Sequence, residues 1–170
     1  YIQEMGKSVT DLATGDAVAC VPLLPCFDCP ECRKQYFSLC KRYQFVGSRS
    51  DGGNAEYVVV RRANLIRLPE KMAIEDGAFI EPITVGLHAF HLAGGCADKN
   101  VVIVGAGTIG MLAMQCALAL GAKSVTAIDI NPDKLALAKS LGATHAFNSR
   151  ELSAAQILEN LTDNRFDQLI

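Results

Sequence analysis

Four cysteines within fifteen residues form the most distinctive chemical pattern of this 170-residue sequence. They are Cys26, Cys29, Cys32 and Cys40, with the spacing C-x2-C-x2-C-x7-C. Four thiolates that one short loop can bring together match a closed tetrahedral zinc site, which is structural because no coordination position stays open. The alternative is an iron–sulfur cluster, but its bacterial pattern ends C-x3-C-P, whereas the last gap here is seven residues. The spacing therefore predicts a structural zinc.

The charges beside these cysteines fit the same interpretation. Zinc with four thiolates has a formal charge of −2, and Arg33, Lys34, Lys41 and Arg42 are close enough in sequence to offset it. Structural zinc binds with apparent energies of roughly 10–16 kcal/mol, so we expect metal removal to disorder this lobe.

A glycine turn after an apolar run is the second pattern with a chemical use. Residues 101–104 (VVIV) lead into Gly105-Ala106-Gly107-Thr108-Ile109-Gly110, followed by an apolar helical pattern that Gly121 ends. In a dinucleotide-binding unit the first glycine makes the turn, the second lets a pyrophosphate approach, and the third lets helix and strand pack closely. The helix start, from Thr108, offers free N–H groups to the phosphates. We therefore expect Gly105, Gly107, Thr108, Ile109 and Gly110 to bind a cofactor.

An acidic residue ends the strand after this helix. Asp129 lies twenty-four residues after Gly105, where a carboxylate would accept both ribose hydroxyls of the adenosine half. No arginine follows immediately, and a 2′-phosphate beside Asp129 would be repelled. The sequence favours NAD over NADP.

Residues 74–93 predict a helix that is broken near Pro82, because proline suits the first turn of a helix. Glu81 would then lie at the helix N-terminus, where the dipole stabilises a carboxylate. His88 and His91 share one helix face and could be ligands, but with no third partner in view we interpret them as core or interface histidines.

Further elements follow from local signals. Residues 17–24 predict a buried strand that Pro22 bends or ends, and residues 55–60 predict a strand after an Asp51-Gly52 hairpin turn. Asn131 and Pro132 predict the start of a helix that Gly142 ends. A third strand (143–147), another helix (about 153–161) and a short fourth strand (166–170) complete the pattern.

Composition excludes several classes of function. The net charge of −2 and the pI near 5.9 argue against nucleic-acid or anionic-membrane binding. Residues 101–122 are uncharged and long enough to span a bilayer, but their glycines and Gln115 favour a turn and an amphipathic helix.

No signal peptide opens the chain, which leads us to expect a cytoplasmic protein. The missing initiator Met and the short last strand suggest an internal piece of a longer protein.

The stretches VACVPLLPC, DGAFIEPITVGLHAFHLA, GAGTIG and GAKSVTAIDI resemble the zinc-dependent medium-chain alcohol and polyol dehydrogenases, and the resemblance covers essentially the whole chain. It implies an α/β protein. Residues 1–80 would be part of a GroES-like β catalytic domain with a zinc lobe at 26–40. Residues 81–170 would be a linking helix and the first part of a doubly wound, NAD-binding Rossmann domain.

The resemblance also implies roles for residues. The four cysteines would hold structural zinc, and Glu81 would be the catalytic carboxylate at a second, catalytic zinc, directly or through water. Ile109, Asp129 and Lys134 match positions that contact NAD, Lys134 acting as a point charge. The implied reaction uses zinc as a Lewis acid while a hydride passes from a sugar alcohol, a hexitol phosphate, to NAD.

Three alternatives stay open. Within the same class these are a sorbitol-type or a threonine-type zinc dehydrogenase. From another class comes a non-catalytic zinc-binding or redox-sensing module, in which the cysteines exchange zinc for disulfides. For the full-length protein the resemblance implies a small-molecule substrate, no nucleic-acid or membrane partner, and a homo-oligomer (dimer or tetramer). We expect the 170 residues alone to be inactive, because the family's other catalytic-zinc ligands would lie upstream of Tyr1.

Overall fold

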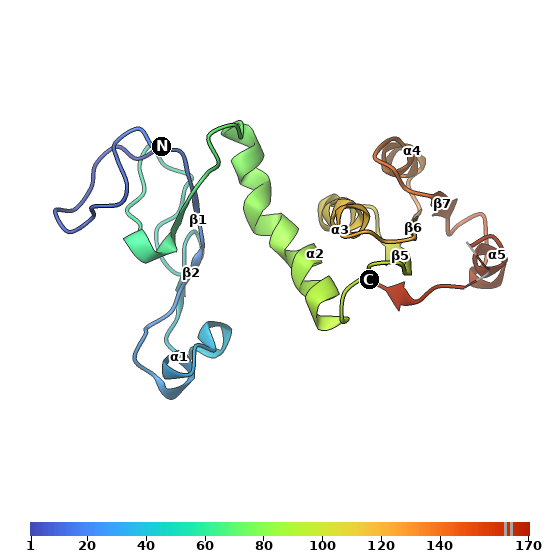
Figure 1. The fold of residues 1–170 in the computed structure, drawn as a ribbon, viewed down its shortest axis with the longest axis horizontal. Helices are drawn as coiled ribbons and strands as arrows, with labels where there is room; N and C mark the ends of the chain where they lie inside the picture. The colour runs from blue at the N-terminus through green and yellow to red at the C-terminus, as the bar shows by residue number, and fades with distance from the viewer. Residues whose placement is uncertain (162, 164) are drawn as a thin grey trace. The chain divides into compact units, whose positions relative to one another are not determined.

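The computed structural model describes residues 1–161, 163 and 165–170, which fall into two units, Tyr1–Ile80 and Glu81–Ile170. The first unit consists of short strands and turns, and the second contains the main sheet with its helices (Figure 1).

Two small antiparallel sheets organise the first unit. Strand β1 (Val18–Cys20) pairs with β4 (Leu65–Arg67), and β2 (Leu23–Leu24) pairs with β3 (Gln44–Phe45). The short helical turns are α1 (Pro30–Arg33), η1 (Phe37–Leu39), η2 (Arg62–Asn64) and η3 (Glu75–Phe79).

Pro22 separates β1 from β2, as the sequence predicts, but the predicted burial is wrong because both strands are only partly buried. Proline has no N–H to donate to a ladder, so the strand cannot run through it. Its carbonyl still accepts the N–H of Val46 at 2.9 Å. The side-chain amide of Asn64 bonds the carbonyls of Val21 and Leu23 at 2.8 and 2.7 Å, which holds the two strand ends together.

The prediction of a strand at residues 55–60 is wrong. The segment has no strand assignment, and Val59 is fully exposed. Its β-branched residues favour an extended chain, but a strand also needs a neighbour to complete its hydrogen-bond ladder. The predicted hairpin turn at Asp51-Gly52 is wrong for the same reason. That loop instead folds back so tightly that a Cβ on Gly52 would lie 2.5 Å from the Cα of Gly47.

The second unit is built on a parallel sheet with the strand order β7-β6-β5-β8 (Figure 1). The strands are β5 (Asn100–Val104), β6 (Ser124–Asp129), β7 (His145–Asn148) and β8 (Gln168–Leu169). The helices are α2 (Ile80–Leu92), α3 (Thr108–Ala119), α4 (Pro132–Ser140) and α5 (Ala154–Glu159). The chain moves outward from β5 to β7 and then returns to the other side of β5. This reversal makes the sheet doubly wound and creates a switch point at the carboxyl end of β5, where ligands bind in such sheets.

Strand β5 is apolar at successive positions instead of alternating apolar and polar residues, and the packing of the core explains why. Val101 and Ile103 belong to a large cluster with α3, whereas Val102 packs on the opposite face with Ile157 and Leu161. Successive strand residues point to opposite faces, so a strand covered on both faces must be apolar throughout.

The predicted helix breaks and ends are confirmed. The 3-10 turn η3 gives way to α2 at Ile80, and Pro82 lies in the first turn of α2, where its missing N–H costs nothing. Asn131 caps α4 by accepting the N–H groups of Asp133 and Lys134. Gly121 and Gly142 follow α3 and α4 with positive φ angles, which L-residues rarely adopt. Among the described residues, no helix is long and apolar enough to cross a membrane.

Candidate functional site: a thiolate cluster and a nucleotide turn

The four cysteines of the first unit come together as predicted. Their sulfur atoms all lie within 4.8 Å of one another, and no other group of three or more His, Cys, Asp or Glu ligands occurs in the part of the chain that the structure describes. Pro30 begins α1, so that Cys29 lies at its N-cap and Cys32 on its first turn, while Cys40 follows η1.

The geometry of this cysteine cluster fits a tetrahedral metal. The Sγ atoms of Cys26 and Cys32 are 3.9 Å apart. Zinc–sulfur bonds of about 2.3 Å in a tetrahedron place the sulfurs about 3.8 Å apart. Cys32 and Cys40 are buried, at 5% and 2% exposure, whereas Cys26 and Cys29 are partly buried. The donor set and spacing therefore fit structural zinc.

The surroundings of the cluster favour the thiolate form of Cys26 and disfavour the thiolate form of Cys32. Backbone N–H groups of Asp28 and Cys29 lower the pKa of Cys26 to about 6. Burial raises the pKa of Cys32 to about 12. Because zinc binds thiolates, a cation at the centre is what would compensate the buried charge of Cys32.

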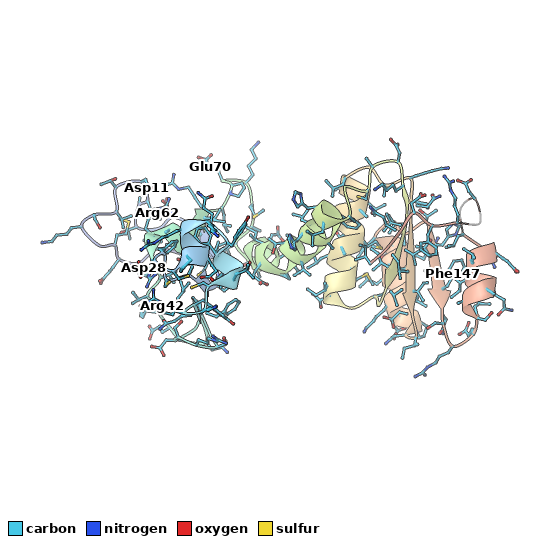
Figure 2. The ribbon with its side chains drawn as sticks, turned by 90° about the horizontal axis from the view of Figure 1, so that it is seen from below. Asp11, Asp28, Arg42, Arg62, Glu70 and Phe147 are labelled. Carbon is cyan, nitrogen blue, oxygen red and sulfur yellow. The ribbon has the colours of Figure 1, made fainter. Side chains whose placement is uncertain are left out.

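Arg42 supplies positive charge to the cluster. Its Nη2 donates to the Sγ of Cys26 at 3.5 Å. The same atom donates to Asp28 at 2.8 Å, and these two residues are labelled in Figure 2. Arg33 bonds the other oxygen of Asp28 at 3.1 Å. Of the four cations expected to offset the cluster charge, Arg42 is therefore in contact with a sulfur, and Arg33 is linked to it through Asp28.

In the second unit, the glycine turn joins β5 to α3. Gly105 has a φ of +98°, and its N–H donates to the carbonyl of Ile128 at 2.8 Å. A Cβ on Gly110 would lie 1.8 Å from the carbonyl oxygen of Gly105. A Cβ on Gly107 would meet nothing within 4 Å, so the chain itself does not require glycine there. Gly107 is the N-cap of α3, and no side chain caps this helix. Its first N–H groups are thus left for a ligand.

Asp129 ends β6 beside this turn. Its Oδ2 accepts the N–H of Ala106 at 2.7 Å, and its Oδ1 accepts the N–H groups of Ile130 and Asn131 at 2.8 and 2.9 Å. Donation from Asn131 is the main reason that the pKa of Asp129 is lowered, and the charge of Lys134 adds to it. Sequence reasoning missed the bond to Ala106. The signal for it was the strand order, which places the end of β6 next to the end of β5.

The remaining predicted residues are at the surface. Thr108 and Ile109 are exposed on the first turn of α3, and Lys134 is exposed on the first turn of α4. Glu81 is exposed on the first turn of α2, where its carbonyl accepts the hydroxyl of Thr84 at 2.6 Å. His88 and His91, interpreted as core or interface histidines, are both exposed on α2, so neither belongs to the core of the chain.

Comparison with known proteins identifies the class. The alcohol dehydrogenase GroES-like domain matches residues 1–70, and the zinc-binding dehydrogenase domain matches residues 108–170. These are the two domains of the zinc-dependent medium-chain dehydrogenases, and the chain contains a match to each of them. Both halves of the predicted fold class are thereby confirmed.

Individual proteins of this class differ in how similar they are to the chain. Galactitol 1-phosphate 5-dehydrogenase of Escherichia coli K12 is 68% identical over 170 residues, which are 100% of this chain and 49% of the relative. The crystal structure of galactitol-1-phosphate dehydrogenase from Escherichia coli superposes with a TM-score of 0.93 at 66% identity, over 99% of this chain and 49% of that one. A zinc-binding dehydrogenase from Sinorhizobium meliloti 1021, bound to NADP, gives a TM-score of 0.86 at 33% identity, over 94% and 46%. The chain thus spans about half the length of these relatives.

Proposed function

We propose that the chain is part of an NAD- and zinc-dependent dehydrogenase that oxidises galactitol 1-phosphate to the ketose phosphate. The observation that carries the proposal is the 68% identity with galactitol 1-phosphate 5-dehydrogenase along the whole chain. The substrate is taken from the name of this relative. The cysteine cluster would bind the structural zinc of such an enzyme, and the glycine turn would bind its NAD.

The proposal gives each predicted residue a role. Cys26, Cys29, Cys32 and Cys40 hold the structural zinc and keep its lobe folded. A second zinc, when bound, supplies Lewis-acid chemistry toward the substrate hydroxyl. Glu81 contributes its carboxylate to that second site, directly or through water. The exposure of Glu81 on the first turn of α2 leaves its carboxylate accessible for this role.

The same proposal assigns NAD to the turn of the second unit. Gly105, Gly107, Thr108, Ile109 and Gly110 form the pyrophosphate side of the site. Asp129 accepts from the adenosine ribose, and Lys134 adds a positive charge nearby. A 2′-phosphate would meet the Asp129 carboxylate, whose lowered pKa keeps it charged at neutral pH. We therefore expect NAD to bind more tightly than NADP, although a relative binds NADP.

Location and assembly are part of the same proposal. No disulfide joins the cysteines of the cluster, and a reducing compartment such as the cytoplasm, which we propose as the location, keeps cysteines available as metal ligands. A homo-oligomer, dimer or tetramer, is proposed from the family resemblance alone.

An assay of NADH formation tests the proposed reaction in the protein that carries this chain. We expect turnover of galactitol 1-phosphate to exceed that of galactitol, sorbitol and threonine. Glu81→Gln should lower kcat about 10- to 100-fold, the range for residues that tune a metal site. Glu75→Gln, an exposed carboxylate on the preceding turn, should leave kcat unchanged. Preferential turnover of sorbitol or threonine would replace the proposal with one of the alternatives.

A further inference from the structure

The glycine turn is fixed to β6 through two consecutive backbone N–H groups. Gly105 donates to the main-chain carbonyl of Ile128, as a regular extension of the sheet. Ala106 donates to a side chain instead, the Oδ2 of Asp129, at 2.7 Å. Ala106 is itself buried, at 4% exposure, so its N–H would lose free energy if it were left without an acceptor.

The carboxylate of Asp129 has enough acceptor positions for a second task. A carboxylate offers about four lone-pair positions. Ile130 and Asn131 use two on Oδ1, and Ala106 uses one on Oδ2. No other donor among the described residues uses the second position on Oδ2, so the same group can hold the turn and accept a ribose hydroxyl at the same time.

We propose that Asp129 is a positioning residue that holds the glycine turn in its phosphate-binding shape before any nucleotide arrives. Coenzyme choice and pyrophosphate binding are then coupled through one carboxylate. A substitution of Asp129 that admits a 2′-phosphate also releases the N–H of Ala106 and loosens the turn under the pyrophosphate. The coupling to coenzyme rests on the proposed function, whereas the hold on the turn does not.

Asp129→Asn separates this role from a general structural one. The amide keeps one oxygen, which can retain both bonds to Ile130 and Asn131, and it then turns its NH2 toward the N–H of Ala106. Hydrogen exchange of the nucleotide-free chain, followed by NMR, should show exchange at Ala106 faster by about tenfold or more, as expected for loss of a hydrogen bond to a charged acceptor. Exchange at Ile130 and Asn131 should accelerate less than exchange at Ala106, since a neutral oxygen acceptor remains there.

Asp133→Asn is the matched control. It removes the same charge from an exposed carboxylate four residues away and should leave exchange at Ala106 unchanged. Unchanged exchange at Ala106 in Asp129→Asn would overturn the proposal. So would equal acceleration at Ala106 in both variants, because charge alone would then explain it.

A second measurement needs no variant. Scalar coupling across the hydrogen bond, between the amide nitrogen of Ala106 and the carboxylate carbon of Asp129, should be detectable in the unmodified chain. Its absence in a spectrum that resolves the backbone couplings of β5 and β6 would also overturn the proposal. Failure of NAD to bind at all would instead refute the proposed function and leave these two results standing.

Discussion

At the scale of single residues, Gly107 and Gly110 lie in one turn, but there is space for a side chain only at Gly107. A methyl group on Gly110 would collide with the backbone carbonyl of Gly105, which cannot move away as a side-chain end could. We expect Gly110→Ala to lower the free energy of unfolding by about 1–3 kcal/mol, the range for overpacking. Urea unfolding followed by circular dichroism measures this loss.

Gly107→Ala is the control in the same turn. Its φ of −78° suits any residue, and the added methyl meets no atom. The free energy of unfolding should change by less than about 1 kcal/mol, since the fewer unfolded conformations of alanine offset its weaker preference for an N-cap. Equal losses in the two variants would show that the close approach at Gly110 does not control the turn.

The charge of Asp129 predicts a pH dependence. Its N–H donors lower its pKa in the folded state, so the carboxylate contributes stability at neutral pH. That contribution is present above the unfolded pKa of about 4 and is lost as the pH falls through the lower, folded value. Between pH 5 and pH 2 the unmodified chain should therefore lose more stability than Asp129→Asn. Denaturant midpoints across this range test the difference, and parallel curves would contradict it.

At the scale of elements, the sequence predicted what local chemistry decides. Asn131, Pro132 and Gly142 bound α4 as expected, because capping and positive φ depend on a few neighbouring residues. The strand at 55–60 was predicted wrongly, because pairing depends on a neighbour that propensity cannot supply.

The same division applies to the candidate site. The four cysteines were predicted together because they lie on one short loop. The bond from Arg42 to Cys26 was expected only as a general charge effect, and the bond from Ala106 to Asp129 was not expected. The bond from Ala106 spans 23 residues and forms only when strand order brings β5 and β6 together.

The contact between α2 and α3 gives a prediction for packing. A Cβ on Gly86 would lie 2.8 Å from the Cα of Ala113, so the two helices touch through backbone. Gly86→Val should force them apart and lower the melting temperature of the second unit, at a cost of about 1–3 kcal/mol. Val85→Ala, half-exposed on the same helix, should change stability by less than about 0.5 kcal/mol. A Gly86→Val variant that melts like the unmodified chain would mean that the contact is not tight in solution.

At the scale of the whole molecule, the two units are stabilised by different means. The second unit has an apolar cluster on each face of its sheet. The first has short strands of two or three residues, and its cysteine loop contains only α1 and η1. Small, loop-rich regions of this kind rely on metal to offset the entropy of ordering the chain.

Metal removal should therefore affect the units unequally. Chelation of zinc should abolish exchange protection in the cysteine loop and leave the amides of β5 and β6 protected. Metal analysis of two paired variants tests the role of the cluster. Cys32→Ser should lose the zinc, whereas Cys20→Ser, outside the cluster, should retain one zinc per chain. If the unmodified chain held no metal and its thiols oxidised readily to disulfides, the redox-sensing alternative would account for the cluster. If chelation instead unfolded both units together, stability would be shared across the boundary at Ile80, and zinc would support the nucleotide domain as well.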